Sequence, residues 1–151
     1  LEKRQFSEDD FALFHPGGNL GRKLTIRTKD VMVTGDMLPV VPEDMLMREA
    51  MNVLSRKNLG IIVAVNQHGK ISGVFTTGDL MRLLEKGKDF LDKPLLDYAS
   101  PKPKTIAPEV LAAKALHVME TNSITCLVVS DPEDRPIGIV QIYYILRAGV
   151  Y

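Results

Sequence analysis

The strongest constraint on how this chain can fold is an internal repeat, in which residues 40–84 align with residues 105–149. Four pairs of matched residues lie 65 positions apart (115 − 50 = 65): Ala50 and Ala115, Val63 and Val128, Gly73 and Gly138, and Arg82 and Arg147. One constant offset across four expected elements indicates that the sequence is duplicated.

Each repeat predicts a helix, two strands and a second helix. A Pro-Glu turn opens an amphipathic helix with apolar positions at Leu46, Ala50, Val53 and Leu54, answered by Leu111, Ala115, Val118 and Met119. The β-branched runs IIVAV and CLVV predict buried strands, and polar turns lead each of them into a second strand, ISGVF or PIGIV. The last helix is expected to begin near Thr77 or Ile142, and residues 24–36 to form a lead-in strand.

A unit of this size cannot bury both faces of its sheet, but two such units can bury one face of each against the other. We therefore expect an α/β (α+β) fold with two pseudo-twofold-related repeats. Each repeat forms a small sheet with two helices, and the two pack sheet to sheet with clefts between them.

The two repeats differ at two polar positions. Thr76 and Asp79 of the first repeat become Gln141 and Tyr144 in the second. Thr76 ends a strand and Asp79 falls in the first helical turn, so a hydroxyl and a carboxylate converge beside helix N–H groups that suit a ribose and a phosphate. The alternative is an ordinary helix start, in which Thr76 or Thr77 caps the helix and Asp79 is favoured by its dipole.

Composition restricts the remaining function classes. The formal net charge of zero over 151 residues gives no global field for nucleic acid or an anionic membrane, and no apolar run approaches the roughly 20 residues that cross a bilayer. Cys126 lies in an apolar run and is expected to be a buried thiol, consistent with a reducing cytoplasm. The three histidines are scattered and the carboxylates lack ligand spacing, so no metal site is expected.

The N-terminal stretch contains HPGG, in which His15 stands beside Pro-Gly-Gly. A loop histidine here is either a linker residue without a role or a proton shuttle whose near-neutral pKa suits sugar chemistry. The residues alone leave both readings open.

The segments DVMVTGD, PEDMLMREAM, NLGIIVAV and GVFTTGDL resemble a tandem cystathionine-β-synthase (CBS) domain pair, a regulatory module that binds adenine nucleotides or other phosphorylated ligands. The resemblance implies a first CBS repeat at 28–90 and a second at 91–151. Residues 1–27 are then a linker that follows a sugar-isomerase domain absent from this chain.

The upstream stretch FSEDDFALFHPGGNLGRKL and the closing LRAGV are similar to D-arabinose 5-phosphate isomerases. That family interconverts D-ribulose 5-phosphate and D-arabinose 5-phosphate through an enediol, for the Kdo of lipopolysaccharide or capsule. The resemblance implies a catalytic role for His15 in the full-length oligomer, a homotetramer. It also implies a homodimer of CBS pairs, and we expect the fragment alone to be inactive.

In CBS pairs the residues that match Thr76 and Asp79 contact ribose and phosphate, and the resemblance adds Thr34, Asn58, Leu59 and Gly60 as ligand-site walls. The implied effector is a nucleotide such as AMP or ATP, or the nucleotide-sugar CMP-Kdo, and no cofactor is required. The alternative is a structural module with vestigial clefts. A third reading, the cytosolic module of a transporter or channel, is disfavoured by the FALFHPGGNLGRK stretch.

Overall fold

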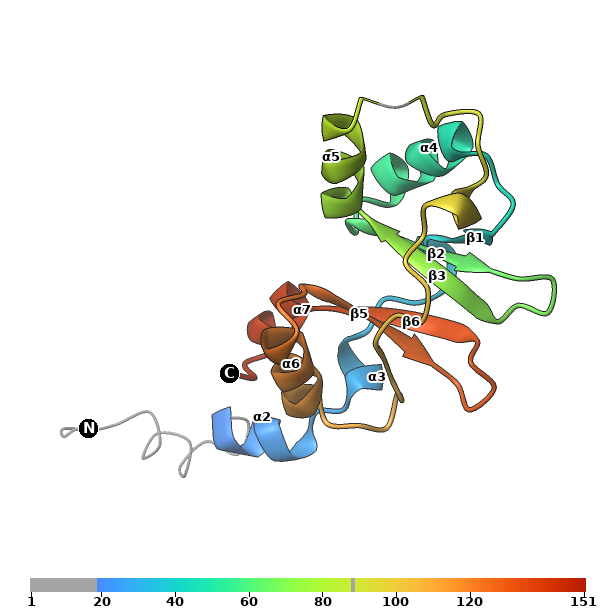
Figure 1. Cartoon of the computed structure of the whole chain (residues 1–151). Coiled ribbons are helices and arrows are strands. Elements are labelled where there is room, and N and C mark those ends of the chain that lie inside the picture. Colours follow the sequence, from blue (N-terminus) through green and yellow to red (C-terminus); the bar gives the residue numbers. More distant parts are fainter. Residues whose placement is uncertain (1–18, 88) are drawn as a thin grey trace.

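The computed structural model of the chain describes residues 19–87 and 89–151, which form two similar units joined side by side (Figure 1). The first unit runs β1 (Val40–Pro42), α4 (Met47–Lys57), β2 (Ile61–Val65), β3 (Ile71–Thr76) and α5 (Thr77–Glu85). The second runs β4 (Thr105–Ile106), α6 (Ala112–Thr121), β5 (Cys126–Ser130), β6 (Pro136–Gln141) and α7 (Ile142–Arg147). Two short helices, α2 (Asn19–Thr25) and α3 (Thr28–Val31), precede them, and the 3-10 turns η1 (Gly35–Met37) and η2 (Leu95–Asp97) lie in the connections.

The two sheets have the same topology and the same register. Each has three strands, in the orders β1-β2-β3 and β4-β5-β6, with the first strand parallel to the second and the third antiparallel to it. Val40 pairs with Val63 in one sheet, and Thr105 pairs with Val128 in the other. The predicted duplication is therefore present in the backbone pairing as well as in the sequence.

The core has three parts. One cluster lies between the first sheet and its helices, and a second lies between the second sheet and its helices. The third consists of buried residues from both sheets together with Leu59, which precedes β2; its members are Leu59, Ile61, Val63, Val128 and Ile139. Because this third cluster joins the two sheets face to face, the expected sheet-to-sheet packing and the α/β fold class are confirmed.

Two details of the prediction were wrong. The prediction missed β1 and β4, which end at or just before the Pro-Glu turns, and the helices that follow those turns begin at Met47 and Ala112. Strands of three and two residues are too short to show a periodic pattern. The expected lead-in strand at 24–36 is instead two short helices with single β-bridges at Arg27 and Val33.

The segments that lead into the two units are exchanged between them. Val33, which precedes the first unit, bridges to Ile139 of the second, and Ser100, which precedes the second unit, bridges to Val74 of the first. Each bridge is closed by a pair of backbone hydrogen bonds, at 2.8 and 3.1 Å for Val33 and at 3.0 and 2.7 Å for Ser100. Each unit is therefore completed by a segment that belongs to the other.

The exchange explains why both repeats carry a glycine in the third strand. A Cβ placed on Gly73 would lie 2.9 Å from both the Ala99 Cβ and the Ser100 carbonyl oxygen. A Cβ placed on Gly138 would lie 2.5 Å from the Met32 Sδ. These glycines leave room for the exchanged segments to pack against the sheets.

Candidate functional site

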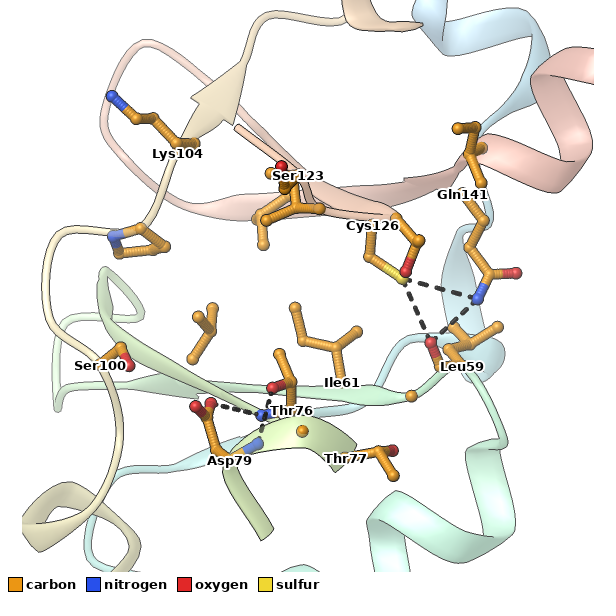
Figure 2. Close-up of a pocket in the computed structure, with 18 of the residues that line it drawn as sticks. Leu59, Ile61, Thr76, Thr77, Asp79, Ser100, Lys104, Ser123, Cys126 and Gln141 are labelled. Carbon is orange, nitrogen blue, oxygen red and sulfur yellow. Dashed lines mark hydrogen bonds between the residues drawn. The ribbon is translucent and has the colours of Figure 1, made fainter. Parts of the chain in front are cut away.

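A cleft of about 670 Å³ lies between the two units, at the end of β3 and the start of α5. Its walls come from both units, and Figure 2 shows them facing each other across it. The lining residues are Leu59, Gly60, Ile61, Val74, Thr76, Thr77, Gly78, Asp79, Arg82, Ser100, Pro103, Lys104, Ser123, Ile124, Thr125, Cys126, Val128, Gln141, Ile142 and Tyr143.

Thr76 and Asp79 form two reciprocal hydrogen bonds at the edge of this cleft (Figure 2). The Asp79 N–H donates to the Thr76 Oγ1 at 3.1 Å, and the Thr76 N–H donates to the Asp79 Oδ2 at 2.9 Å. This is a capping box, which satisfies two backbone donors at the start of α5. The ordinary helix-start reading is therefore correct as geometry, and the same two side chains also line the cleft.

Arg82 completes the polar group. Its guanidinium donates to the Asp79 Oδ1 at 2.6 Å, and the side chain of Asp79 is 21% exposed. Partial burial raises the pKa of Asp79, but the hydrogen bonds from the Thr76 backbone and from Arg82 outweigh it, so the pKa lies below its ordinary value of 3.8. The carboxylate is therefore ionised at neutral pH.

The first turn of α5 has fewer unused N–H groups than the sequence suggested. The Thr77 N–H donates to the Gly60 carbonyl at 3.0 Å, and the Asp79 N–H is held by Thr76. Gly78 is the first-turn residue whose N–H these two contacts do not use. The Arg82 guanidinium lies over Gly78, with its terminal nitrogens 3.5 Å from where a Cβ would be.

The wall opposite Asp79 comes from the second unit and its lead-in segment. Ser100, Pro103 and Lys104 form one part, and Ser123, Ile124 and Thr125 form another. In Figure 2 the side chain of Lys104 lies across the cleft from Asp79, with its ammonium group turned away from the carboxylate. Asp79, Arg82 and Lys104 are the charged side chains that line the cleft among the described residues.

At the other end of the cleft a polar contact crosses between the units (Figure 2). The Gln141 Nε2 donates to the Leu59 carbonyl at 2.9 Å, and the Cys126 Sγ–H donates to the same carbonyl at 3.3 Å. Burial raises the pKa of the Cys126 thiol, although hydrogen bonds from Gln141 and Thr125 partly offset it. Cys126 is half-buried and lines the cleft, so the expectation of a fully buried thiol is only partly met, while its raised pKa does not favour a nucleophile.

The structure places four of the predicted ligand residues on the cleft, namely Leu59, Gly60, Thr76 and Asp79. Thr34 and Asn58 are not among its lining residues. The backbone next to Thr34 pairs with the second unit, because the lead-in segments are exchanged. Asn58 ends α4 in the left-handed conformation, with φ 55° and its N–H donating to the Leu54 carbonyl, a position that asparagine tolerates well. His15 lies outside the described residues.

The sequence reasoning missed Arg82 and the wall formed by Ser100, Lys104 and Ser123. A signal for Ser123 was present, because it is the repeat partner of Asn58 (123 − 58 = 65) and shares its left-handed backbone, with φ 54°. Its place across the cleft from Thr76 depends on which unit faces which, and a repeat alone does not give that.

Within residues 19–87 and 89–151, no cluster of three or more His, Cys, Asp or Glu residues could hold a metal ion. None of the helices in these same ranges is long and apolar enough to span a membrane.

Comparison with known proteins agrees with this architecture. Residues 28–86 and 95–151 each match the family model described as "CBS domain", and the chain therefore belongs to the CBS domain family and contains that domain twice. It is 44% identical over 150 residues to the arabinose 5-phosphate isomerase KdsD of Pseudomonas aeruginosa, which covers 99% of this chain and 46% of the relative. The chain thus spans about half the length of the curated relatives it matches.

Solved CBS structures have the same fold. The CBS domain protein PAE2072 from Pyrobaculum aerophilum, complexed with AMP, is similar with a TM-score of 0.72 and 22% identity, over 80% of this chain and 90% of that one. The CBS domain pair of protein MJ0100, in complex with 5′-methylthioadenosine and S-adenosyl-L-methionine, gives 0.71 and 21%, over 80% and 93%. At 21% and 22% identity, the similarity to these structures shows the fold alone.

Proposed function

We propose that this CBS pair is the regulatory ligand-binding module of an arabinose 5-phosphate isomerase, and that it binds a nucleotide in the cleft beside Thr76 and Asp79. The observation that carries the proposal is the convergence of the Thr76 hydroxyl, the ionised Asp79 carboxylate and the start of α5 on one cleft between the units. The parent enzyme would interconvert D-ribulose 5-phosphate and D-arabinose 5-phosphate in the cytoplasm, for Kdo and lipopolysaccharide or capsule. His15 would serve its active site in the oligomer.

The chemistry of the cleft suits the parts of a nucleotide. Each carboxylate oxygen has two acceptor positions, so Asp79 can accept from ribose hydroxyls while it keeps its bonds to Thr76 and Arg82. The Gly78 N–H and the Arg82 guanidinium lie together at the helix start, where an anion is favoured. Apolar side chains of Ile61, Val74 and Ile124 offer a surface for a base.

The comparisons support a nucleotide in general terms. The PAE2072 structure contains AMP, and the two ligands of the MJ0100 structure share an adenosine group with it. The arabinose 5-phosphate isomerase relatives suggest a second candidate, CMP-Kdo, because an end product of the same pathway is a sensible feedback signal. Both candidates contain a ribose and a phosphate group.

Calorimetric titration of the chain with AMP, ATP, CMP and CMP-Kdo tests the proposal. We expect at least one of them to bind, and Asp79→Asn to weaken that binding about tenfold or more, because it removes the charge and one acceptor oxygen. Asp92→Asn is the matched control, since Asp92 is an exposed carboxylate paired with Arg48 outside the cleft. Absence of heat from all four ligands with folded protein would overturn the proposal.

One observation favours the alternative function, a structural module that joins subunits. The helices α5 and α7 expose large apolar side chains, with Met81 54%, Leu84 54%, Tyr143 59% and Leu146 43% exposed. Such a surface suits a homodimer of CBS pairs within a homotetrameric enzyme. The titration distinguishes the two functions when it is combined with analytical ultracentrifugation, because a purely structural module would dimerise and bind none of the four ligands.

A further inference from the structure

The pseudo-twofold repeat relates the cleft at Thr76 to a second position between the units. Each segment that lines the Thr76 cleft has, at this second position, its counterpart from the other repeat. Gln141 and Tyr144 stand there in place of Thr76 and Asp79 (141 − 76 = 65). The segment around Leu59 replaces that around Ile124, and the first lead-in segment around Thr34 replaces that around Pro101. What occupies this second position decides how many ligands one chain can hold.

The side chain of Gln141 spans the gap between the units where the Thr76 cleft, which Gln141 also lines, borders the second position. It starts from the end of β6 in the second unit, and its Nε2 reaches the Leu59 carbonyl of the first unit at 2.9 Å (Figure 2). The same nitrogen lies 3.6 Å from the Cys126 Sγ, which donates to that carbonyl as well. Thr76, the partner of Gln141, bonds to its own helix through the Asp79 N–H and does not cross the gap.

A second contact ties the walls of the same position. The Lys57 ammonium, at the end of α4, donates to the Asp36 carbonyl in the first lead-in segment. Asn122, the repeat partner of Lys57 (122 − 57 = 65), instead turns its Nδ2 back to the Val118 carbonyl of its own helix at 2.8 Å. Among the described residues, both cross-connections are thus on the Gln141 side.

We infer that the amide of Gln141 is the built-in occupant of the second position, closed over by Lys57, so that each chain takes one nucleotide, in the Thr76 cleft. This inference rests on the proposed function. A ligand at the second position would have to displace the Gln141 amide from Leu59 and find Tyr144 where Asp79 offers a carboxylate. The lost hydrogen bond and the missing acceptor both oppose binding there.

Titration with AMP as the first probe, and CMP-Kdo as the second, tests the inference through the number of ligands bound. The double substitution Gln141→Thr with Tyr144→Asp restores the first-repeat residues, and it should raise the number from one to two per chain. Gln67→Thr is the matched control, because Gln67 lies in an exposed hairpin turn, and it should leave one. The reciprocal change Thr76→Gln should weaken binding in the first cleft about tenfold or more.

The outcomes separate this inference from the proposed function. Two ligands per wild-type chain, or still one in a folded double variant, overturn the role of Gln141 and leave the proposed function standing. If the double variant does not fold, Gln141→Ser with Tyr144→Asp is judged by the same number of ligands per chain.

If the folded wild type binds none of AMP, ATP, CMP and CMP-Kdo, the proposed function is overturned. The hydrogen bond from Gln141 to the Leu59 carbonyl is then tested by urea unfolding. Gln141→Thr should lower the unfolding midpoint, and Gln67→Thr should not. Equal midpoints would refute the connection.

Discussion

The substitution Gly73→Ala tests the exchange of the lead-in segments, on which the composition of the cleft depends. Gly73 lies in β3, where alanine is otherwise acceptable because the residue does not adopt a positive φ. The added methyl group would lie 2.9 Å from the Ala99 Cβ and from the Ser100 carbonyl oxygen. Neither obstacle is the end of a flexible side chain, so the Ser100 segment itself must move.

The magnitude follows from two opposing effects. Overpacking of this kind costs about 1–3 kcal/mol, and we take the upper end because backbone must shift. Replacement of glycine by alanine lowers the entropy of the unfolded chain and returns roughly 0.4–1 kcal/mol. The net loss of unfolding free energy is therefore about 2 kcal/mol, and displacement of Ser100 should also weaken ligand binding.

Gly138→Ala is the matched variant in the second repeat. Its nearest obstacle, at 2.5 Å, is the Met32 Sδ, which belongs to a flexible side chain that can turn away. The Val33 carbonyl at 3.2 Å needs to give by only a few tenths of an ångström. We therefore expect a net change in unfolding free energy of about 0.5 kcal/mol or less.

Urea unfolding of the two variants and the wild type, at one protein concentration, measures the difference. With a slope of about 2 kcal/mol/M, Gly73→Ala should lower the midpoint by roughly 1 M, and Gly138→Ala by much less. Equal midpoints for the two variants would refute the reasoning, and so would a Gly73→Ala variant as stable as the wild type. Either result would mean that Ser100 does not pack on β3 as described.

Two further predictions concern titratable groups of the cleft. Because the folded state lowers the pKa of Asp79 below 3.8, the carboxylate's contribution to stability is present at neutral pH and is lost as the pH falls through that lowered pKa. The Asp79→Asn variant should therefore be less stable than the wild type at pH 7, and its stability should approach that of the wild type at pH 3. An equal difference between the two urea midpoints at both pH values would contradict this. Because burial raises the pKa of Cys126, alkylation by iodoacetamide at pH 8 should be at least about tenfold slower in the folded chain than in urea, and equal rates would show that the thiol is accessible.

The sequence alone was sufficient for the repeated framework. The offset of 65 between matched residues, and the apolar runs at 61–65 and 126–129, led correctly to paired strands and helices in each unit. The strands β1 and β4 could not be predicted, because the parallel partner of a strand lies far away in sequence and so short a segment carries no periodicity. The lead-in segments failed for a related reason, since their single bridges depend on the opposite unit.

The candidate site divides in the same way. Thr76 and Asp79 are three residues apart at a strand-to-helix junction, so local geometry alone brings them together, as expected. Ser100 and Ser123 join them only through tertiary packing. Thr34 and Asn58 come into the prediction only through the resemblance to CBS pairs, and the exchange of lead-in segments pairs the backbone next to Thr34 with the second unit.

The two repeats satisfy their last helix in different ways, which gives a physical reason for their different polar residues. In the first repeat a capping box starts α5, which has nine residues, and no bond from Thr76 crosses to the other unit. In the second repeat Gln141 provides no side-chain cap for α7, which has six residues, and its amide bonds across the interface to Leu59. A side chain at this position can cap its own helix or join the two sheets, and a threonine is too short to do the second. The threonine cap of the first repeat leaves an open cleft beside the Asp79 carboxylate. The glutamine of the second repeat instead forms a hydrogen bond that joins the two units. The absence of a Thr-Asp pair from the second repeat is therefore more than the decay of a second ligand site. Gln141 gives the two units a polar connection that a symmetric module with two open clefts would lack.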